Sequence, residues 1–253
     1  MDSSTTQRLV PLQGVHNFRD IGGYLGEAGM TVKKNMMYRA DGLYRLTASD
    51  IEVVRSLGIQ TVIDLRSDEE LSNVGTFPCD AYEVSFHHVP IIDSTWQHSD
   101  VPDFDEDTEF LIWAYTQMLS EGATRFQQAF SIIAQSPRLP LVFHCAAGKD
   151  RTGLLAMLLL GVLGVDDDVI VADYALSGPA MLRMMEWAQS EYPDLEARMT
   201  ASPKYFLSAN PQAMSQLIKT LRDEHRDFQG IAMSLGITEA EIESLKSMML
   251  VTN

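Results

Sequence analysis

The stretch that decides the fold of this 253-residue chain is Leu141-Val-Phe-His-Cys-Ala-Ala-Gly-Lys-Asp-Arg-Thr-Gly153. It begins inside an apolar run, Leu139 to Phe143, which is typical of a fully buried strand. From Arg151 to Gly164 the residues are again mostly apolar and predict a buried helix. Because a short loop of small residues joins the strand to the helix N-terminus, backbone N–H groups can gather there and bind an anion.

The loop supplies the candidate anion ligands. Ala146, Ala147 and Gly148 have little side chain to obstruct the backbone N–H groups, which can turn inward as a cradle. The helix that begins near Arg151 adds its positive dipole end, and the guanidinium offers a planar fork that suits two phosphate oxygens. Lys149 adds a second cation to the same loop.

Cys145 lies at the base of this predicted cradle. The N–H groups, the helix dipole and Arg151 would stabilise its thiolate and make it a nucleophile at neutral pH. Thr152 can donate its hydroxyl to the same sulfur and improve it as a leaving group in a second step. His144 is placed to fix the loop through ring hydrogen bonds rather than to act as a base. The simpler alternative is a buried cysteine at a strand end with no chemical role.

Composition and charge narrow the function classes. The chain is 45% hydrophobic and 21% charged, as expected of a globular protein with one sizeable core. Its net charge of −16 repels phosphate backbones and anionic lipid heads, so nucleic acids are not expected partners. The longest apolar stretch, Leu154 to Val165, is about half of the roughly 20 residues that a membrane span requires, so no stable membrane insertion is expected. With only Cys79 and Cys145, and with a polar start from Met1 to Pro11, we expect a cytoplasmic protein.

Outside the central stretch, short apolar runs alternate with helical patterns. Ile59 to Leu65 and Tyr82 to Ile92 are the other predicted strands. Such alternation predicts an α/β fold around a mainly parallel sheet flanked by helices, with the late helices as a cover. Predicted helices cover Thr47 to Gly58, a short segment capped by Ser67 to Glu70, Glu109 to Leu119, Thr124 to Ala134, Asp166 to Leu176, Pro179 to Gln189, Pro211 to Glu224 and Thr238 to Leu250.

The central stretch resembles the signature of the cysteine-dependent tyrosine and dual-specificity phosphatases, in particular their atypical bacterial and fungal group. The resemblance covers about Leu12 to Leu250 and implies a protein-tyrosine-phosphatase-like fold. We therefore expect a flexible N-terminus over 1–11 and one phosphatase domain over 12–253. Other stretches similar to the group are Asn17-Phe-Arg-Asp-Ile-Gly-Gly23, Tyr38-Arg39, Leu46-Thr47, Gly58-Ile59, Val62-Ile-Asp-Leu-Arg-Ser67, Asp173-Tyr-Ala-Leu-Ser177 and Leu235-Gly-Ile-Thr238.

A general acid is needed to protonate the leaving oxygen. Many cysteine phosphatases take it from a Trp-Pro-Asp loop, which this chain lacks; Val101-Pro102-Asp103 imitates that loop within an acidic stretch. The resemblance favours Asp150, inside the phosphate loop, over Asp103, with Asp64 as a possible supporter. Asp64 is implied to hydrogen-bond to the loop, against a plain role as the cap of the following short helix.

Four further features have two interpretations each. Arg19 and Asp20 form either a structural ion pair or, as the resemblance implies, neighbours of the active site. Gly22-Gly23 reads as a tight turn rather than a binding loop. The Met-rich stretch from Gly178 to Trp187 is either a core-facing helix or part of a helical lid within 178–210, as the group would use. Three histidines lack the spacing of metal ligands, and we interpret them as surface or core residues: His87, His88 and His98.

Together these residues predict a phosphomonoester hydrolase that works through a cysteinyl-phosphate intermediate and needs no metal or cofactor. Phosphotyrosine protein is the nominal substrate, with phosphoinositides or a small phosphate ester as alternatives. Two rivals remain from other classes: a phosphate-binding module without turnover, and a sulfurtransferase that also holds a cysteine in an amide cradle.

Overall fold

Five short strands form the central sheet of the computed structural model, which describes residues 8–93, 102, 104, 106–191 and 208–252. The strand order is β1-β3-β6-β4-β5, and every pairing is parallel except that of β1 with β3. The mainly parallel α/β fold expected from the sequence is therefore confirmed. The strands are β1 (Arg19–Asp20), β3 (Met37–Ala40), β4 (Thr61–Asp64), β5 (Ser85–His88) and β6 (Leu141–His144), with β2 (Thr31–Val32) and β7 (Leu250–Val251) forming a separate two-stranded ribbon.

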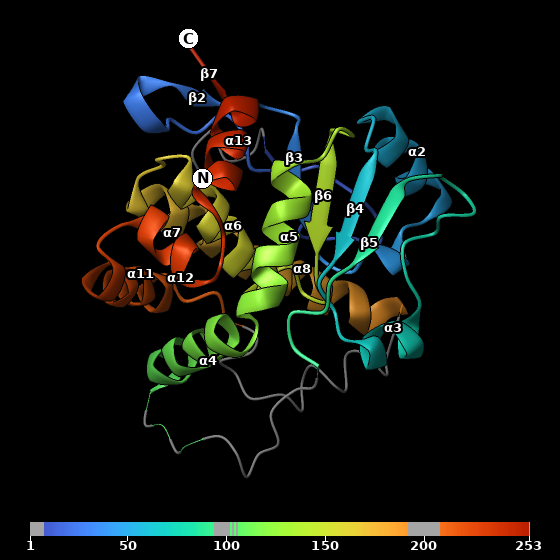
Figure 1. Cartoon of the computed structure of the whole chain (residues 1–253). Coiled ribbons are helices and arrows are strands. Elements are labelled where there is room, and N and C mark those ends of the chain that lie inside the picture. The colour runs from blue at the N-terminus through green and yellow to red at the C-terminus, as the bar shows by residue number, and fades with distance from the viewer. Residues whose placement is uncertain (1–7, 94–101, 103, 105, 192–207, 253) are drawn as a thin grey trace.

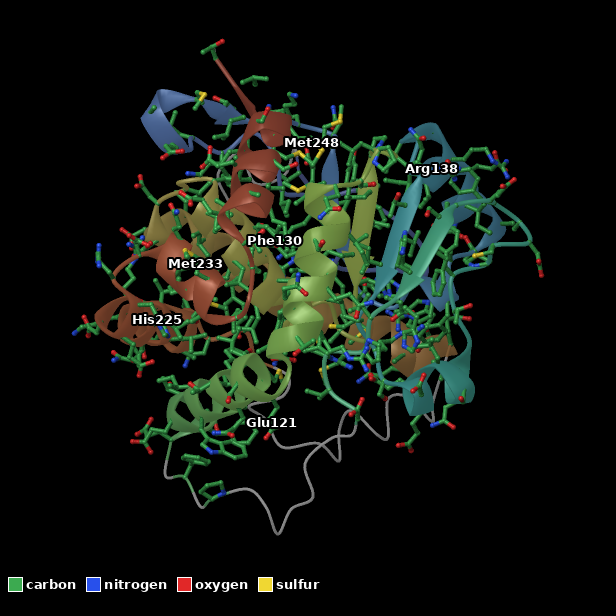
Figure 2. The ribbon with its side chains drawn as sticks, in the orientation of Figure 1. Glu121, Phe130, Arg138, His225, Met233 and Met248 are labelled. Atoms are coloured by element: carbon green, nitrogen blue, oxygen red, sulfur yellow. The ribbon has the colours of Figure 1, made fainter. Side chains whose placement is uncertain are left out.

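Both faces of the sheet are covered, because alternate residues of each strand point to opposite sides. Val62 and Val142 belong to the smaller buried cluster, which also includes a residue of helix α2 (Ala48–Ser56). Ile63 and Phe143 belong to the larger cluster, together with Phe130 of helix α5 (Ala123–Ala134). Phe130 lies in the interior of the molecule (Figure 2). The buried sheet thus explains why its strands read as nearly continuous apolar runs.

The larger core is built by helices that surround α6 (Asp150–Val162). Figure 1 shows α5 in front of the sheet, with the C-terminal helices gathered beside α5 and α6. In this layer α12 packs on α6, α13 packs on α5, and α11 packs on both α4 and α7. The remaining helices are α3 (Asp68–Val74), α4 (Asp107–Glu121), α7 (Asp167–Ala175), α8 (Ser177–Glu191), α11 (Pro211–His225), α12 (Phe228–Ser234) and α13 (Glu239–Met249), with single 3₁₀ turns at Glu27–Gly29 and Leu43–Arg45.

Three helix starts follow the capping boxes recognised in the sequence. Thr47, Ser67 and Thr238 each accept a hydrogen bond from the backbone N–H three residues later, and the acidic side chain there returns one. These local signals fixed the starts of α2, α3 and α13. Several elements were not predicted. The two-residue strands β1, β2 and β7 are too short to give a pattern, β3 carries Arg39 and so lacks an apolar run, and α12 is only seven residues long.

No helix among the described residues is long and apolar enough to cross a membrane. Even α6, whose side chains are almost all buried, has only 13 residues, and it is enclosed by other helices instead.

Candidate active site

The loop singled out in the sequence lies at the carboxyl end of the parallel strands, where α/β folds bind ligands. β6 ends at His144 and α6 begins at Asp150, so residues 145–149 turn between them. Asp64, at the end of β4, pairs in register with His144. Cys145 is the first residue of the loop and is only 2% exposed.

Three successive carbonyl groups of the loop are bound from behind by the body of the protein. Because the N–H and C=O of one peptide unit point in opposite directions, the N–H groups of these units face away from those contacts, as a cradle of amides requires. Gly148 has φ +64°, and a Cβ there would lie 2.4 Å from the Ala40 carbonyl oxygen, so glycine is needed. The bonds run from Gly42 N–H to Ala146 O (3.1 Å), from Asn17 Nδ2 to Ala147 O (3.0 Å) and Gly148 O (3.0 Å), and from the Arg39 guanidinium to Gly148 O (2.8 Å).

A buried ion network holds Arg39 in place behind the loop. Asp173 of α7 accepts from Arg39 at 2.6 Å and from Arg19 at 3.1 Å, and all three side chains are buried. Although burial alone would raise it, the two arginines lower the pKa of Asp173 to about 2, so the carboxylate stays charged. The interpretation of Arg19 and Asp20 as an ion pair was therefore wrong, because Arg19 pairs with Asp173. Asp20 instead accepts backbone N–H groups at a turn.

Arg151 is held by a carboxylate that the sequence showed only as a helix cap. Its two terminal nitrogens donate to the two oxygens of Glu70, at 2.5 and 2.8 Å. Glu70 also accepts the Ser67 backbone N–H in the capping box of α3. Although burial opposes it, the Arg151 guanidinium lowers the pKa of Glu70. One carboxylate therefore both starts a helix and fixes the plane of the arginine fork.

Asp150 stands at the first position of α6 and makes contacts on one oxygen. Its Oδ1 accepts from the Tyr115 hydroxyl at 2.6 Å, and the Tyr115 hydroxyl lies 2.6 Å from that of Tyr174. Tyr115 was not singled out in the sequence, because no local pattern links α4 to the loop, and Tyr174 appeared only within the stretch Asp173 to Ser177 that resembles the family. Lys149, expected to face the anion, is instead buried; its ammonium donates to the Ser208 carbonyl at 2.9 Å and lies 3.4 Å from Asp150.

His144 and Asp64 lie together under the loop. The His144 ring nitrogen Nε2 is 3.4 Å from Asp64 Oδ2, and its Nδ1 is 3.4 Å from the Cys145 carbonyl oxygen. Burial lowers the pKa of His144, so the ring is neutral at pH 7, as suits a structural rather than a basic role. The cap role considered for Asp64 was wrong, since Ser67 caps α3. Asp64 chiefly accepts from the Arg66 guanidinium, at 2.6 Å for the shortest bond.

Thr152 is fully buried one residue beyond Arg151, and its hydroxyl has no partner among the described residues. Met181 and Met184 of α8 are also buried, and they pack with Ala147 of the loop. The methionines of the Met-rich stretch therefore cover the loop itself rather than the large core. The Trp187 ring of the same helix lies 5.3 Å from that of His16, which fastens α8 to the body.

The remaining candidates do not gather at the loop. His87 contacts Ser85, and His88 contacts the Arg66 carbonyl. Among the residues that the structure describes, no group of three or more potential ligands could hold a metal ion. Asp103, the alternative acid, and His98 lie outside the described residues.

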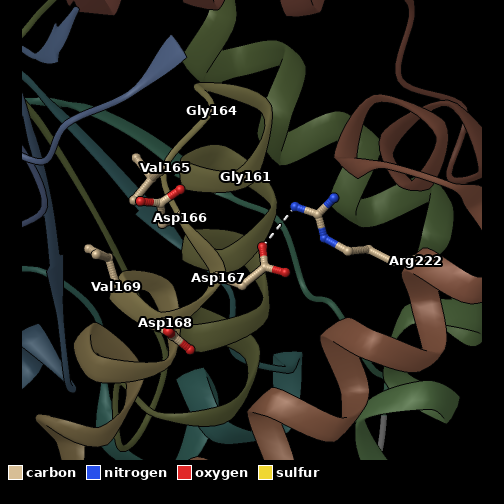
Figure 3. Close-up of a pocket in the computed structure, with 8 residues that line it drawn as sticks. All are labelled: Gly161, Gly164, Val165, Asp166, Asp167, Asp168, Val169 and Arg222. Atoms are coloured by element: carbon tan, nitrogen blue, oxygen red, sulfur yellow. Dashed lines mark hydrogen bonds and ion pairs between the residues drawn. The ribbon is translucent and has the colours of Figure 1, made fainter. Parts of the chain in front are cut away.

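A separate surface pocket lies at the opposite end of α6, about 20 Å from Asp150 at the rise of a helix of this length (Figure 3). It is lined by three consecutive aspartates at the start of α7, where the helix dipole favours negative charge. Arg222 of α11 donates to Asp167 at 2.7 Å. The ion pair neutralises Asp167 at the start of the helix.

Sequence comparison finds relatives that are named as phosphatases. A Mycobacterium tuberculosis protein named triple specificity protein phosphatase PtpB is 26% identical, over 94% of this chain and 98% of its own length. A tyrosine-protein phosphatase of Nostoc commune is 29% identical, over 82% of this chain and 72% of its own. A Cupriavidus necator protein that carries the name of a tyrosine-protein phosphatase is 32% identical over 63% of this chain; the match spans 59% of that relative's length.

Solved structures with some likeness include the Siw14 catalytic core, with a TM-score of 0.40 and 14% identity over 79% of this chain and 99% of its own. Another is TpbA of P. aeruginosa in complex with pTyr, with a TM-score of 0.31 and 18% identity over 68% of this chain and 91% of its own. Both TM-scores are below 0.5, so the assignment rests on the sequence comparisons. The model of the tyrosine phosphatase family matches residues 10–251. Nearly the whole chain thus fits that model, and the chain belongs to the tyrosine phosphatase family, as its signature had indicated.

Proposed function

We propose that this phosphomonoester hydrolase works through a cysteinyl-phosphate intermediate on Cys145. The observation that carries the proposal is the loop itself: its carbonyls are turned back onto Asn17, Arg39 and Gly42, while Arg151 is locked by Glu70 beside it. A phosphate group that enters this loop meets backbone N–H groups and a fixed guanidinium, and a cysteine lies at the loop's start.

In the first step the Cys145 thiolate attacks phosphorus, an S–P bond forms and the ester P–O bond breaks. The carboxyl proton of Asp150 moves to the leaving oxygen, so the alcohol departs neutral. Arg151 and the N–H groups of Ala146, Ala147, Gly148 and Lys149 hold the phosphate oxygens during transfer.

In the second step water attacks phosphorus, gives a proton to Asp150 and breaks the S–P bond. Phosphate leaves and the thiolate returns. The buried Thr152 hydroxyl is available to donate to the sulfur at this point. His144 and Asp64 support the loop from below without exchanging protons with the substrate.

We propose phosphotyrosine protein as the principal substrate. The methionines that pack on Ala147 provide an apolar, deformable wall next to the loop, which suits an aromatic ring. The ammonium of Lys149 already has the Ser208 carbonyl and Asp150 as neighbours, which disfavours a role as ligand of a second phosphate group. The net charge of −16 also works against a polyanionic lipid head.

A substrate panel tests this choice. Phosphotyrosyl peptides should give kcat/KM values about 10-fold or more above those for phosphoinositides, phosphoseryl peptides and small alkyl phosphates. The reason is that only the aromatic ester places a ring against the methionine side chains. Each class should be assayed with the same enzyme sample by phosphate release. Phosphoinositides hydrolysed as well as the peptides would overturn the substrate assignment while leaving the cysteine mechanism intact.

The acid assignment makes its own prediction. Asp150→Asn should lower kcat on phosphotyrosine by roughly 10²–10⁴, the usual scale of acid catalysis, and the loss should shrink for phenols of low pKa, which leave without a proton. Asp103→Asn is the matched control and should change little. The measurement is kcat across aryl phosphates of graded leaving-group pKa. A steep dependence found only in the Asp103 variant would move the acid to that residue, and its absence from both variants would rule out both residues as the acid.

We further propose that residues 12–253 form one phosphatase domain, with 1–11 as an appended N-terminus. The family match over 10–251 supports this division. The helical lid expected within 178–210 begins in α8, whose methionines cover the loop; residues 192–207 lie outside the described part of the chain.

A further inference from the structure

We propose that Tyr115 is a positioning residue for the general acid, holding one carboxyl oxygen of Asp150 so that the other faces the leaving group. This inference rests on the proposed role of Asp150. Tyr115 belongs to α4, 35 residues before Asp150, and its hydroxyl donates to Asp150 Oδ1 at 2.6 Å. No other hydroxyl donor to this carboxyl is present among the described residues.

The donor is itself held rigidly. Tyr115 is 1% exposed, and its hydroxyl lies 2.6 Å from that of Tyr174, which is equally buried. The two rings meet edge to face, with centroids 6.1 Å apart and planes at 81°. With its own hydrogen directed to Asp150, Tyr115 is left to accept from Tyr174. Two hydrogen bonds in series thus join α7 to α4 and α4 to the start of α6: Tyr174 donates to Tyr115, and Tyr115 donates to Asp150.

This arrangement suits an acid that gains and loses a proton in each turnover. When Asp150 is protonated, Oδ1 is occupied by the Tyr115 donor, so Oδ2 is the oxygen left to carry the transferable proton. Once that proton has moved to the leaving oxygen, the carboxylate charge is stabilised by the Tyr115 O–H. Burial, and then the Asp150 carboxylate, raise the pKa of Tyr115, so the donor remains protonated across any practical pH range.

The other groups that face Asp150 do not replace this contact. Lys149 Nζ lies 3.4 Å from Oδ1, and Arg151 follows directly in the chain. Tyr174 approaches Asp150 from α7, but its hydroxyl contacts that of Tyr115 and not the carboxyl group. All three groups keep their charge or hydrogen when only the Tyr115 hydroxyl is removed, and the effect of that removal is therefore attributable to one hydrogen bond.

The test is Tyr115→Phe, which keeps the ring and deletes the donor. On phosphotyrosine kcat/KM should fall by about 10-fold, as for loss of a hydrogen bond to a charged group, while esters of acidic phenols should be hydrolysed at nearly the wild-type rate. The basic limb of the kcat/KM pH profile reports deprotonation of the acid. Removing a donor to the carboxylate favours the protonated form, so this limb should move to higher pH by about one unit.

Tyr174→Phe is the matched control, because it deletes a buried hydroxyl from the same pair but leaves the bond to Asp150. It should keep the position of the basic limb, and its melting temperature should fall about as much as that of Tyr115→Phe. A uniform loss on all esters, with an unmoved limb, would show a purely structural role for Tyr115 and overturn the proposal. The Asp150→Asn variant distinguishes this failure from a failure of the proposed function. If its loss of rate does not depend on the pKa of the leaving group, Asp150 is not the general acid, whatever the Tyr115 variant shows.

Discussion

Cys145→Ser is expected to lower turnover of an aryl phosphate by roughly 10⁴-fold or more, on the scale seen when a catalytic nucleophile is removed. A serine hydroxyl stays protonated at neutral pH in a site that stabilises a thiolate, so no nucleophile of comparable strength remains. Binding of the phosphate ester should survive. Arg151 remains fixed by Glu70, and the loop carbonyls remain bound by Asn17 and Arg39, since none of these contacts uses the sulfur.

The measurement combines single-turnover kinetics with calorimetric titration of the uncleaved ester into the variant. Cys79→Ser provides the control, because Cys79 is the other cysteine and is exposed in a different part of the chain. It should leave both rate and affinity unchanged. Activity of Cys145→Ser within tenfold of wild type would remove the covalent mechanism from consideration.

Local sequence signals predicted the parts of the fold that depend on neighbours in the chain. The capping boxes at Thr47, Ser67 and Thr238 placed three helix starts, because both partners of each box lie within four residues. The apolar run before Cys145 and the apolar stretch after Arg151 placed β6 and α6 for the same reason.

Contacts between distant residues were outside the reach of such patterns. Arg39 gives β3 a charged residue that argues against a buried strand, and only Asp173, 134 residues later, neutralises it. Glu70 read as a helix cap, and its bond to Arg151 spans 81 residues. The sequence therefore predicted the loop and its candidate catalytic residues, whereas the residues that orient them became visible only when the chain was folded.

The side chain of Lys149 points away from the role that its position in the sequence suggested. Its position in the phosphate loop suggested a second cation for the anion. In the fold the side chain is fully buried, and its ammonium contacts the Ser208 carbonyl beyond α8. A lysine stem is long enough to reach either direction, and the choice depends on chain segments that are remote in sequence.

Arg151→Lys is expected to be nearly as damaging as loss of the nucleophile, lowering kcat/KM by roughly 10³-fold or more. A guanidinium has five N–H donors, and two of them are used by Glu70, which leaves three for the phosphate. An ammonium has three donors in a tetrahedral array. If two of these satisfy Glu70, one remains, and if they turn to the phosphate, the Glu70 carboxylate faces a dianion without its counter-charge.

Glu70→Gln separates the two parts of this argument. The amide keeps one acceptor for the guanidinium and loses the charge, so kcat/KM should fall by about 10-fold, a smaller loss than that of Arg151→Lys. In the double variant Arg151→Lys with Glu70→Gln, the losses should be less than additive, because a lysine freed from the carboxylate can turn to the phosphate. Steady-state kinetics of the four proteins on phosphotyrosine, with melting temperatures to confirm folding, complete the cycle. If Arg151→Lys kept more than a tenth of wild-type activity, the planar fork would not be the group that binds the transferred phosphate. Strict additivity would mean that Glu70 acts only as the cap of α3, and that the orientation of Arg151 owes nothing to it.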